Sequence, residues 1–304
     1  MMHRRQRKTK GLLPLIFVVA ILAVGFYVFA LAGNGLGTED APRTLLEPRN
    51  NARENTGAND PPGFPAFTSQ VHVREVTDRQ YLKLVNRDRA IESSIDAARL
   101  VEVWPTPPAR ATDVVLHETA FSAVRELFAL SHHANIGSLF IACGFRTTET
   151  QRIFYTYAAD RRYVMPPGHS EHQLGLAADI LIEGDTTGMI GTPAAAWLAE
   201  NAPQFGLILR YPADKEDITG VAYEPWHFRY VGQVHAWYMG RQNFVLEEYI
   251  EYLQVTGGFQ AEFSGKTYYV LYQRPENGMI FVPEDLNFWI SSANTGGYVV
   301  TAWR

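Results

Sequence analysis

The sequence predicts an α+β domain that is preceded by a membrane helix and followed by a β-rich extension. Strand-like and helix-like segments follow one another without the regular alternation of a doubly wound sheet, which favours the α+β class. The chain has 304 residues and is 46% hydrophobic, which is enough for one sizeable core. After about residue 255, the segments with regular patterns all resemble strands.

The N-terminal region has the features of a signal anchor. Residues 11–32 form an uncharged apolar run that is long enough, at about 1.5 Å per residue, to cross a bilayer. Five basic residues precede this run, so we expect residues 1–10 to be a cytoplasmic basic stub and the body to be extracellular. A cleaved signal peptide is the alternative, because Ala30-Leu31-Ala32 resembles a cleavage site. The apolar run exceeds the usual length of roughly 7–15 residues, so we favour a single-pass protein of the cell membrane.

Composition restricts the rest of the chain further. Residues 33–66 are rich in Gly, Pro and polar residues without apolar periodicity, which predicts a flexible linker. From residue 11 onward there are 22 basic and 32 acidic residues, a net charge of −10, which argues against nucleic acid as a partner. The single cysteine, Cys143, excludes an intrachain disulfide. We expect a small buried hydrophobe on a strand, with a thiol nucleophile as the less favoured alternative.

Local patterns predict the elements of the globular part, which begins near Phe67. Short apolar or alternating runs predict strands over residues 81–86, 139–142, 179–182, 207–211, 267–272, 288–290 and 298–301. Apolar spacing and capping residues predict helices over residues 118–134, 148–157, 193–201, 234–240 and 245–254. Thr148 with Gln151 resembles a capping box, and Thr192 followed by Pro193 forms a second helix start.

Two short stretches contain residues that can bind one metal ion together. Residues 170–179 read SEHQLGLAAD and residues 224–227 read EPWH. They supply His172, Asp179 and His227, and a hydrolytic zinc site usually has three such ligands and a water. Gly175 allows the chain to turn tightly between the first two ligands. Glu224 lies three residues before His227 and can take a proton from a metal-bound water.

Other residues have weaker claims to a role in the site. His169 is a competing but less favoured ligand, and His117 and His235 lack a partner motif. The adjacent histidines at positions 132 and 133 are expected on a solvated helix face. Trp226 can line a pocket or fill the core, and we favour the core.

The combined motifs resemble those of the zinc D-alanyl-D-alanine carboxypeptidases of the VanY type. The pattern Ser-x-His-x-x-Gly-x-Ala-x-Asp spans residues 170–179, and Glu-x-Trp-His spans residues 224–227. Upstream, Gly144-Phe145-Arg146-Thr147-x-x-x-Gln151 is similar to the family's Gly-Tyr-Arg-Ser-x-x-x-Gln, with Phe for Tyr and Thr for Ser. The resemblance covers about residues 67–254, which would form the zinc carboxypeptidase domain, and leaves residues 255–304 as a C-terminal β-rich extension.

The resemblance implies a fold, a cofactor and roles for individual residues. The fold would be a small central antiparallel sheet with flanking helices, shared with the Hedgehog signalling domain. His172, Asp179 and His227 would bind Zn²⁺, and Glu224 would be the catalytic base and acid. Arg146 would face the substrate and the oxyanion, a role that suits a planar guanidinium. The residues that would hold the peptide terminus are Gln151, Ser170 and Tyr211.

The resemblance also implies an activity. A zinc-activated water would remove the terminal D-Ala from peptidoglycan stem peptides, which would be partners on the cell-wall side. The same family contains L,D-carboxypeptidases and VanX-type D,D-dipeptidases, and both remain alternatives. A non-catalytic wall-binding protein is a more remote alternative, because it predicts a broken ligand or base. We expect a monomer, and we expect residues 255–304 to pack on the catalytic domain rather than contact wall polymer.

Overall fold

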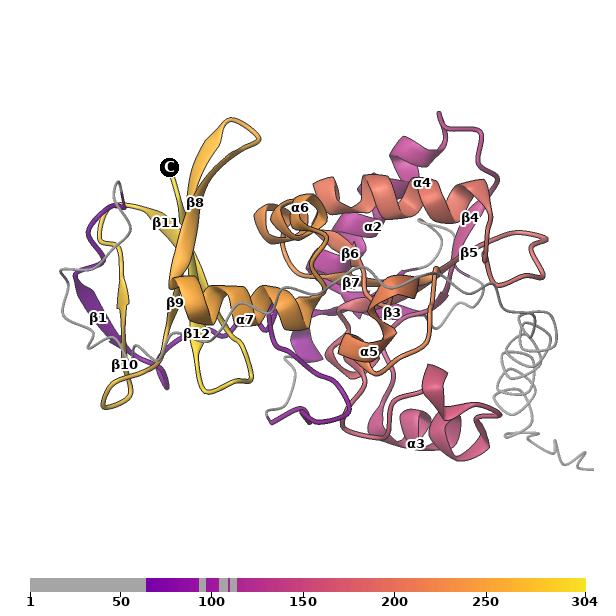
Figure 1. Cartoon of the computed structure of the whole chain (residues 1–304), viewed down its shortest axis with the longest axis horizontal. Helices are drawn as coiled ribbons and strands as arrows, with labels where there is room; N and C mark the ends of the chain where they lie inside the picture. The colour runs from indigo at the N-terminus through magenta and orange to yellow at the C-terminus, as the bar shows by residue number, and fades with distance from the viewer. Residues whose placement is uncertain (1–63, 93–96, 104–108, 110–113) are drawn as a thin grey trace, which may run out of the picture.

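A computed structural model describes residues 64–92, 97–103, 109 and 114–304 (Figure 1). The expected basic stub, membrane helix and residues 33–63 of the linker lie outside this part. Among the described residues, no helix is both long and apolar enough to cross a bilayer. Figure 1 shows strands β4 to β7 with their helices in one half and strands β1 and β8 to β12 in the other, with α7 between them.

The first half is built on a four-stranded antiparallel sheet, which we call the central sheet. Its strand order is β4-β5-β7-β6. The strands are β4 (Leu139–Cys143), β5 (Ala177–Ile182), β6 (Leu207–Leu209) and β7 (His227–Tyr230). Three of the four were predicted with shifted ends. The strand β7 was missed, because its residues HFRY were interpreted only as part of a motif.

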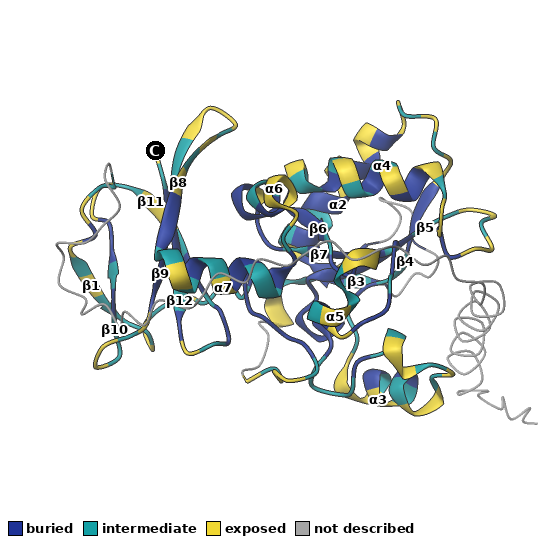
Figure 2. Cartoon of the chain, in the orientation of Figure 1, coloured by how far each residue is buried: buried dark blue, intermediate teal, exposed yellow. Residues whose placement is uncertain are grey.

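Helices cover one face of the central sheet. The helices α2 (Glu118–Ser131) and α4 (Pro193–Asn201) share a core with the sheet residues Ile141, Ile180 and Phe228. Side chains alternate between the two faces of a strand, so Asp179 and His227 project from the opposite face. Figure 2 shows the strands of this sheet as largely buried.

The N-cap residue predicted from the sequence is correct for one helix and wrong for another. Thr192 accepts a hydrogen bond from Ala195 N at 3.2 Å at the start of α4, as predicted. At the start of α3 (Thr148–Tyr157), the cap is Thr147, whose hydroxyl accepts from Thr150 N at 3.1 Å. The predicted capping box of Thr148 with Gln151 is therefore wrong. The Gln151 side chain is buried and bonds elsewhere.

The second half is a β unit with a four-stranded antiparallel sheet, which we call the C-terminal sheet. Its order is β11-β12-β9-β8. The strands are β8 (Gly258–Phe263), β9 (Lys266–Gln273), β11 (Asn287–Ser292) and β12 (Tyr298–Trp303). A separate pair joins β1 (Ser69–His72) to β10 (Met279–Val282). The first described strand thus pairs with the C-terminal region, although the sequence suggested that residues from 67 onward build the catalytic part.

The two halves share a hydrophobic core. The helices α6 (Gln233–Gln242) and α7 (Leu246–Thr256) contribute Val234, Ile250 and Leu253, which cluster with Ile208 of the central sheet and Val299 of the C-terminal sheet. The C-terminal segment therefore packs on the rest of the chain, as expected. Smaller elements are β2 (Leu100–Glu102), β3 (Val115–His117) and α5 (Glu216–Thr219).

Residues 81–86 form no regular strand, which corrects the prediction. All six are buried, because this segment lies between the two halves. Leu84 N donates to Ala293 O at 3.2 Å, whereas Arg229 Nη2 donates to Tyr81 O at 3.2 Å. The alternating pattern arises because the segment is buried against the half that contains the central sheet on one side and the β unit on the other, and not because it has the two faces of a strand in a sheet.

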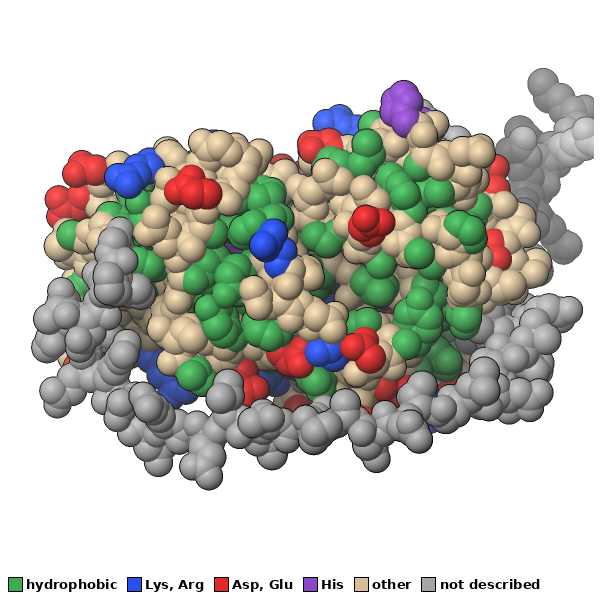
Figure 3. Space-filling model, turned by 45° about the horizontal axis from the view of Figure 1, so that its top comes forward, with side chains coloured by type: hydrophobic (Ala, Val, Ile, Leu, Met, Phe, Trp, Pro, Cys, Tyr) green, Lys and Arg blue, Asp and Glu red, His purple; other side chains and the backbone are tan. Residues whose placement is uncertain are grey.

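The described residues on the face in Figure 3 carry mixed charge. On the face shown in Figure 3, Lys and Arg side chains lie singly or beside Asp and Glu. A protein that binds a polyanion usually gathers its cations on one face or along one helix. The face in Figure 3 has no such continuous basic stripe.

Candidate metal centre

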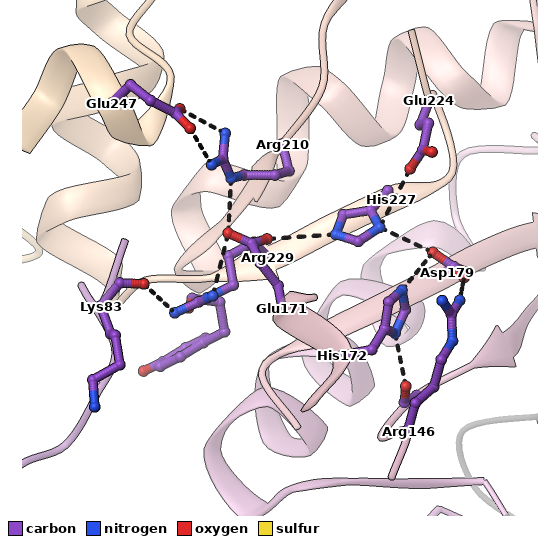
Figure 4. A network of polar contacts seen from close by, with 12 residues as sticks. Lys83, Arg146, Glu171, His172, Asp179, Arg210, Glu224, His227, Arg229 and Glu247 are labelled. Atoms are coloured by element: carbon purple, nitrogen blue, oxygen red, sulfur yellow. Dashed lines mark hydrogen bonds and ion pairs between the residues drawn. The ribbon is translucent and has the colours of Figure 1, made fainter. Parts of the chain in front are cut away.

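The central sheet brings two of the expected metal ligands side by side. Asp179 of β5 is the direct register partner of His227 in β7. Asp179 Oδ1 lies 3.2 Å from His227 Nδ1 and 3.4 Å from His172 Nε2 (Figure 4). This oxygen is buried and has no hydrogen-bond partner among the described residues. Three donor atoms from separate elements thus converge on one point.

His172 is held by a tight turn. It lies in the 3₁₀ turn Glu171–Leu174, which ends at Gly175 with φ +68°. The positive φ favours glycine at this position, and a Cβ there would also lie 2.7 Å from Leu100 Cδ2, so that the leucine side chain would have to shift. His172 Nδ1 lies 2.7 Å from Gly144 O, and only a protonated nitrogen can donate to a carbonyl. The neutral ring therefore presents the lone pair of Nε2 to the site.

His227 is surrounded by carboxylates. Its Nδ1 lies 3.4 Å from Glu224 Oε2, and its Nε2 lies 3.5 Å from Glu171 Oε2. Burial alone would lower the pKa of His227, but the neighbouring carboxylates of Asp179 and Glu171 raise it to about 9. In contrast, burial and the charge of Arg146 lower the pKa of His172 to about 4. The acidic surroundings of His227 favour positive charge at this point, as a cation site requires.

Glu224 is buried and lies in the turn just before β7. Its backbone N donates to Tyr211 O at 3.0 Å, and His227 N donates to Glu224 O at 3.1 Å. Burial raises the pKa of its carboxyl to about 8, although the neighbouring His227 opposes the rise. A carboxyl group that titrates near neutral pH can both accept and return a proton.

Arg146 joins the site from the loop between β4 and α3. Its Nη2 donates to Asp179 Oδ2 at 3.0 Å and its Nη1 donates to Gln151 Oε1 at 3.3 Å. Its Nε lies 3.1 Å from Cys143 Sγ. These contacts fix the guanidinium next to the Asp179 carboxylate and place a positive charge at the edge of the site.

Cys143 lies closer to the site than the sequence suggested. It is half-buried at the end of β4, where it is the register partner of Asp179, and it contacts Arg146. The possible ligand atoms of Cys143, His172 and Asp179 all lie within 4.8 Å of one another, so the thiol is an alternative third donor. We favour His227, because its Nδ1 lies next to the unpartnered Asp179 Oδ1, whereas the sulfur already accepts a hydrogen bond from Arg146.

The residues expected to hold a peptide terminus lie around these ligands. Gln151 bridges Arg146 and Met165 O, to which its Nε2 donates at 2.6 Å. The Tyr211 ring lies with its centroid 4.8 Å from that of His227. Ser170 is buried directly before the turn that carries His172.

The remaining candidates lie outside the ligand cluster. His169 Nδ1 lies 2.8 Å from Asn86 O. The two histidines at positions 132 and 133 are exposed, as expected, but they follow the end of α2 rather than lying on a helix face. His117 caps α2 by accepting from Thr119 N. Trp226 is only half-buried and stacks on Tyr163 with ring centroids 6.3 Å apart, so the expectation of core packing is wrong.

A group of buried charges lies behind His227 and was not predicted from the sequence. Glu171 and Arg210 form an ion pair at 2.8 Å, and both side chains are fully buried. Arg229 also approaches Glu171, and Glu247 approaches Arg210. The available signal was Glu171 itself, a charged residue directly before a proposed ligand.

Comparisons with known proteins define the family. The profile of the VanY family, described as D-alanyl-D-alanine carboxypeptidase, matches residues 113–233. A solved VanY D,D-pentapeptidase from a VanB-type vancomycin-resistance cassette, in complex with Zn(II), is 33% identical, and the match covers 57% of this chain and 99% of that one. The chain belongs to the VanY family.

Other members of the VanY group show how far the similarity extends. A D-alanyl-D-alanine carboxypeptidase of Enterococcus faecium is 38% identical over 169 residues, so the chain spans about half the length, 55%, of that curated relative. The TM-score to the solved VanY pentapeptidase is 0.46. The D,D-dipeptidase VanXYg, solved with a D-Ala-D-Ala phosphinate analogue, gives a TM-score of 0.67 at 27% identity. That match covers 78% of this chain and 98% of VanXYg, which supports the same mixed α/β fold.

Proposed function

We propose that this protein is a zinc-dependent D,D-carboxypeptidase that removes the terminal D-Ala from peptidoglycan stem peptides. The observation that carries the proposal is the position of Asp179 Oδ1 between His172 Nε2 and His227 Nδ1. Glu224, a buried carboxyl, lies directly beside this cluster. The VanY family supports the substrate, since its profile is described by the same activity.

The donor set fits zinc. Two imidazole nitrogens and one carboxylate oxygen are ligands that catalytic zinc sites use, with a further position left for water or substrate. The unpartnered, buried Asp179 Oδ1 is the strongest sign of fit, because such an atom is costly without a partner. Zinc held there would lower the pKa of a water molecule and polarise a carbonyl group. His172, Asp179 and His227 would be its ligands.

The residues of the chain perform the proton transfer and the positioning. Glu224 takes the proton of the attacking water and then delivers it to the leaving amine of D-Ala, and its raised pKa suits both steps. Arg146 stabilises the negative charge that develops at the scissile carbonyl, and its three contacts hold it ready for this role. Gln151, Ser170 and Tyr211 bind the C-terminal end of the peptide.

A comparison of three substrates tests the proposal. The full-length, zinc-loaded chain is incubated with stem pentapeptide, stem tetrapeptide or free D-Ala-D-Ala, and the products are identified by mass spectrometry. We expect loss of one alanine from the pentapeptide. Shortening of the tetrapeptide alone would instead establish an L,D-carboxypeptidase. Cleavage of the dipeptide alone would establish a dipeptidase like VanXYg, and no cleavage would favour a wall-binding protein.

We further propose a membrane anchor. The support is the uncharged run of residues 11–32 with five basic residues before it. In this proposal the enzyme is a monomer that crosses the membrane once, its domain faces the cell wall, and residues 33–66 are the linker. N-terminal sequencing of the mature protein tests this, and a start at Gly33 would show a cleaved signal peptide instead.

A further inference from the structure

A chain of buried charges connects His227 to helix α7 (Figure 4). Glu171 Oε1 accepts a hydrogen bond from Arg210 Nε at 2.8 Å and lies 3.3 Å from Arg229 Nη1. The other end of the Arg210 guanidinium donates from Nη1 and Nη2 to Glu247, at 2.8 Å and 2.7 Å. Arg210 is thus clamped between a carboxylate of the metal centre and a carboxylate in the first turn of α7.

Burial makes this arrangement rigid. The side chains of Glu171, Arg210 and Arg229 are all 0% exposed, so solvent screens them little. Removal of one partner would leave another charge buried without compensation, which strongly disfavours alternative positions. The planar guanidinium also fixes the direction of each hydrogen bond. Glu171 is therefore held in one orientation, with Oε1 occupied by the two arginines.

The second oxygen of Glu171 faces His227. Oε2 and His227 Nε2 are both buried, both lack a hydrogen-bond partner among the described residues, and lie 3.5 Å apart. This separation is longer than an ordinary hydrogen bond, and a shift of a few tenths of an ångström would close it. An imidazole that offers Nδ1 to a metal carries its proton on Nε2, and a carboxylate at that nitrogen fixes both the tautomer and the ring orientation.

Helix α7 connects these ion pairs to the β unit. Its residues Tyr249, Ile250 and Leu253 are buried in the core shared with the C-terminal sheet. Glu247 also accepts from Asn86 Nδ2 at 3.1 Å, which connects the segment between the two halves to the same carboxylate. The carboxylate that holds the far end of the Arg210 side chain therefore lies on a helix that packs against the C-terminal sheet.

We propose that Glu171 is a positioning residue for His227 and that Glu247, acting through Arg210, holds Glu171 in place. The β unit that packs against α7 then supports the metal centre, although it supplies no ligand. This inference rests on the metal site of the proposed function, and it adds a role for a region outside the residues 113–233 that match the family profile.

The test compares three variants of the full-length chain. Glu171→Gln and Glu247→Gln remove one charge each with little change of shape. Glu251→Gln is the matched control, because Glu251 is an exposed glutamate one turn further along α7. The zinc dissociation constant is measured by competition with a chelator. The visible absorption spectrum of the cobalt-loaded protein reports the geometry of the ligands.

We expect Glu171→Gln to weaken zinc binding by about 10–100-fold, the usual effect of losing a partner of a metal-bound histidine, and to alter the cobalt spectrum. Glu247→Gln should have a smaller effect in the same direction. The double variant should be no worse than Glu171→Gln, because both act along one path. Glu251→Gln should match the wild type.

Wild-type zinc affinity and cobalt spectrum in both Glu171→Gln and Glu247→Gln would overturn the inference. If Glu171→Gln does not fold, the zinc affinity and cobalt spectrum of Glu247→Gln decide whether the inference holds. The cobalt spectrum reports only on folded, metal-bound protein. A wild-type chain that binds zinc but cleaves no peptide would refute the proposed function. The effect of the variants on zinc affinity would still decide the positioning role.

Discussion

Asp179 and His227 are paired directly across two neighbouring antiparallel strands, with Asp179 Oδ1 3.2 Å from His227 Nδ1. The register of β5 against β7 therefore places two of the three proposed ligands side by side. A slip of one residue would turn His227 to the face covered by α2 and α4. The core residues Ile180 and Phe228 on that face hold the register, so packing and metal geometry are linked.

Asp179→Asn should remove the metal. The amide keeps the size of the side chain but loses the negative charge between the two histidines, so zinc affinity should fall by more than the roughly 10–100-fold typical of an outer partner. Zinc content after dialysis, measured by atomic absorption, gives the result. Circular dichroism confirms the fold. Stoichiometric zinc in this variant would refute the ligand assignment.

Glu224→Gln should leave the metal in place and stop turnover. The amide cannot accept and return the proton, and the loss of a general base typically costs about 10²–10⁴-fold in rate. The measurement is kcat for D-Ala release together with zinc content. Glu183→Gln, a change at an exposed glutamate just after β5, is the control and should behave as the wild type. Equal rates for Glu224→Gln and the control would rule out the proposed role.

Arg146→Lys should lower kcat/KM by about 10²–10³-fold, the usual effect of losing one donor to a developing oxyanion. A lysine cannot reproduce the three directed contacts with Asp179, Gln151 and Cys143. Zinc content should not change. Cys143→Ala should reduce activity less, because Arg146 keeps its other two partners. Complete loss of activity in Cys143→Ala would instead support a catalytic thiol if zinc stays bound, or a thiol as the third metal ligand if zinc is lost.

His235 should make stability fall in acid. It is fully buried between Tyr249 and Thr301, and burial lowers its pKa to about 3. The unfolded chain binds a proton here with a pKa near 6.5, so unfolding takes up a proton between these two values. The stability due to the neutral ring is present above about pH 6.5 and is lost progressively as the pH falls towards 3.

The contribution of His235 can be measured by comparing how the free energy of unfolding changes with pH in the wild type and in His235→Gln. Its titration should remove about 2 kcal/mol of unfolding free energy between pH 7 and pH 5. Urea denaturation of the metal-free full chain at both pH values gives the wild-type change, which should be smaller by about this amount in His235→Gln. His132→Gln alters an exposed histidine and should leave the wild-type change intact. The same pH dependence in His235→Gln would contradict the assignment.

Local sequence signals predicted much of the central sheet and most of the proposed site. The helix start at Thr192 and Pro193 follows from capping chemistry within a few residues. The spacing of His172, Gly175 and Asp179 identified a turn that the structure contains. These predictions are correct because the residues that determine each feature lie close together in the sequence.

Long-range contacts account for what the sequence did not predict. The pairing of β1 with β10 joins segments about 200 residues apart, and neither segment has a pattern that names its partner. Residues 81–86 alternate like a strand but are buried between the two halves. The ion pairs of Glu171 and Glu247 with Arg210 depend on where α7 packs, which no local motif specifies.

The most direct test of the zinc carboxypeptidase is a zinc titration of the metal-free, full-length chain. Bound zinc and the release of D-Ala from stem pentapeptide are measured in the same samples. The structure predicts that release rises in proportion to bound zinc and reaches its plateau at one ion per chain. Full release without zinc, or one bound zinc per chain without any release, would contradict a zinc-dependent D,D-carboxypeptidase.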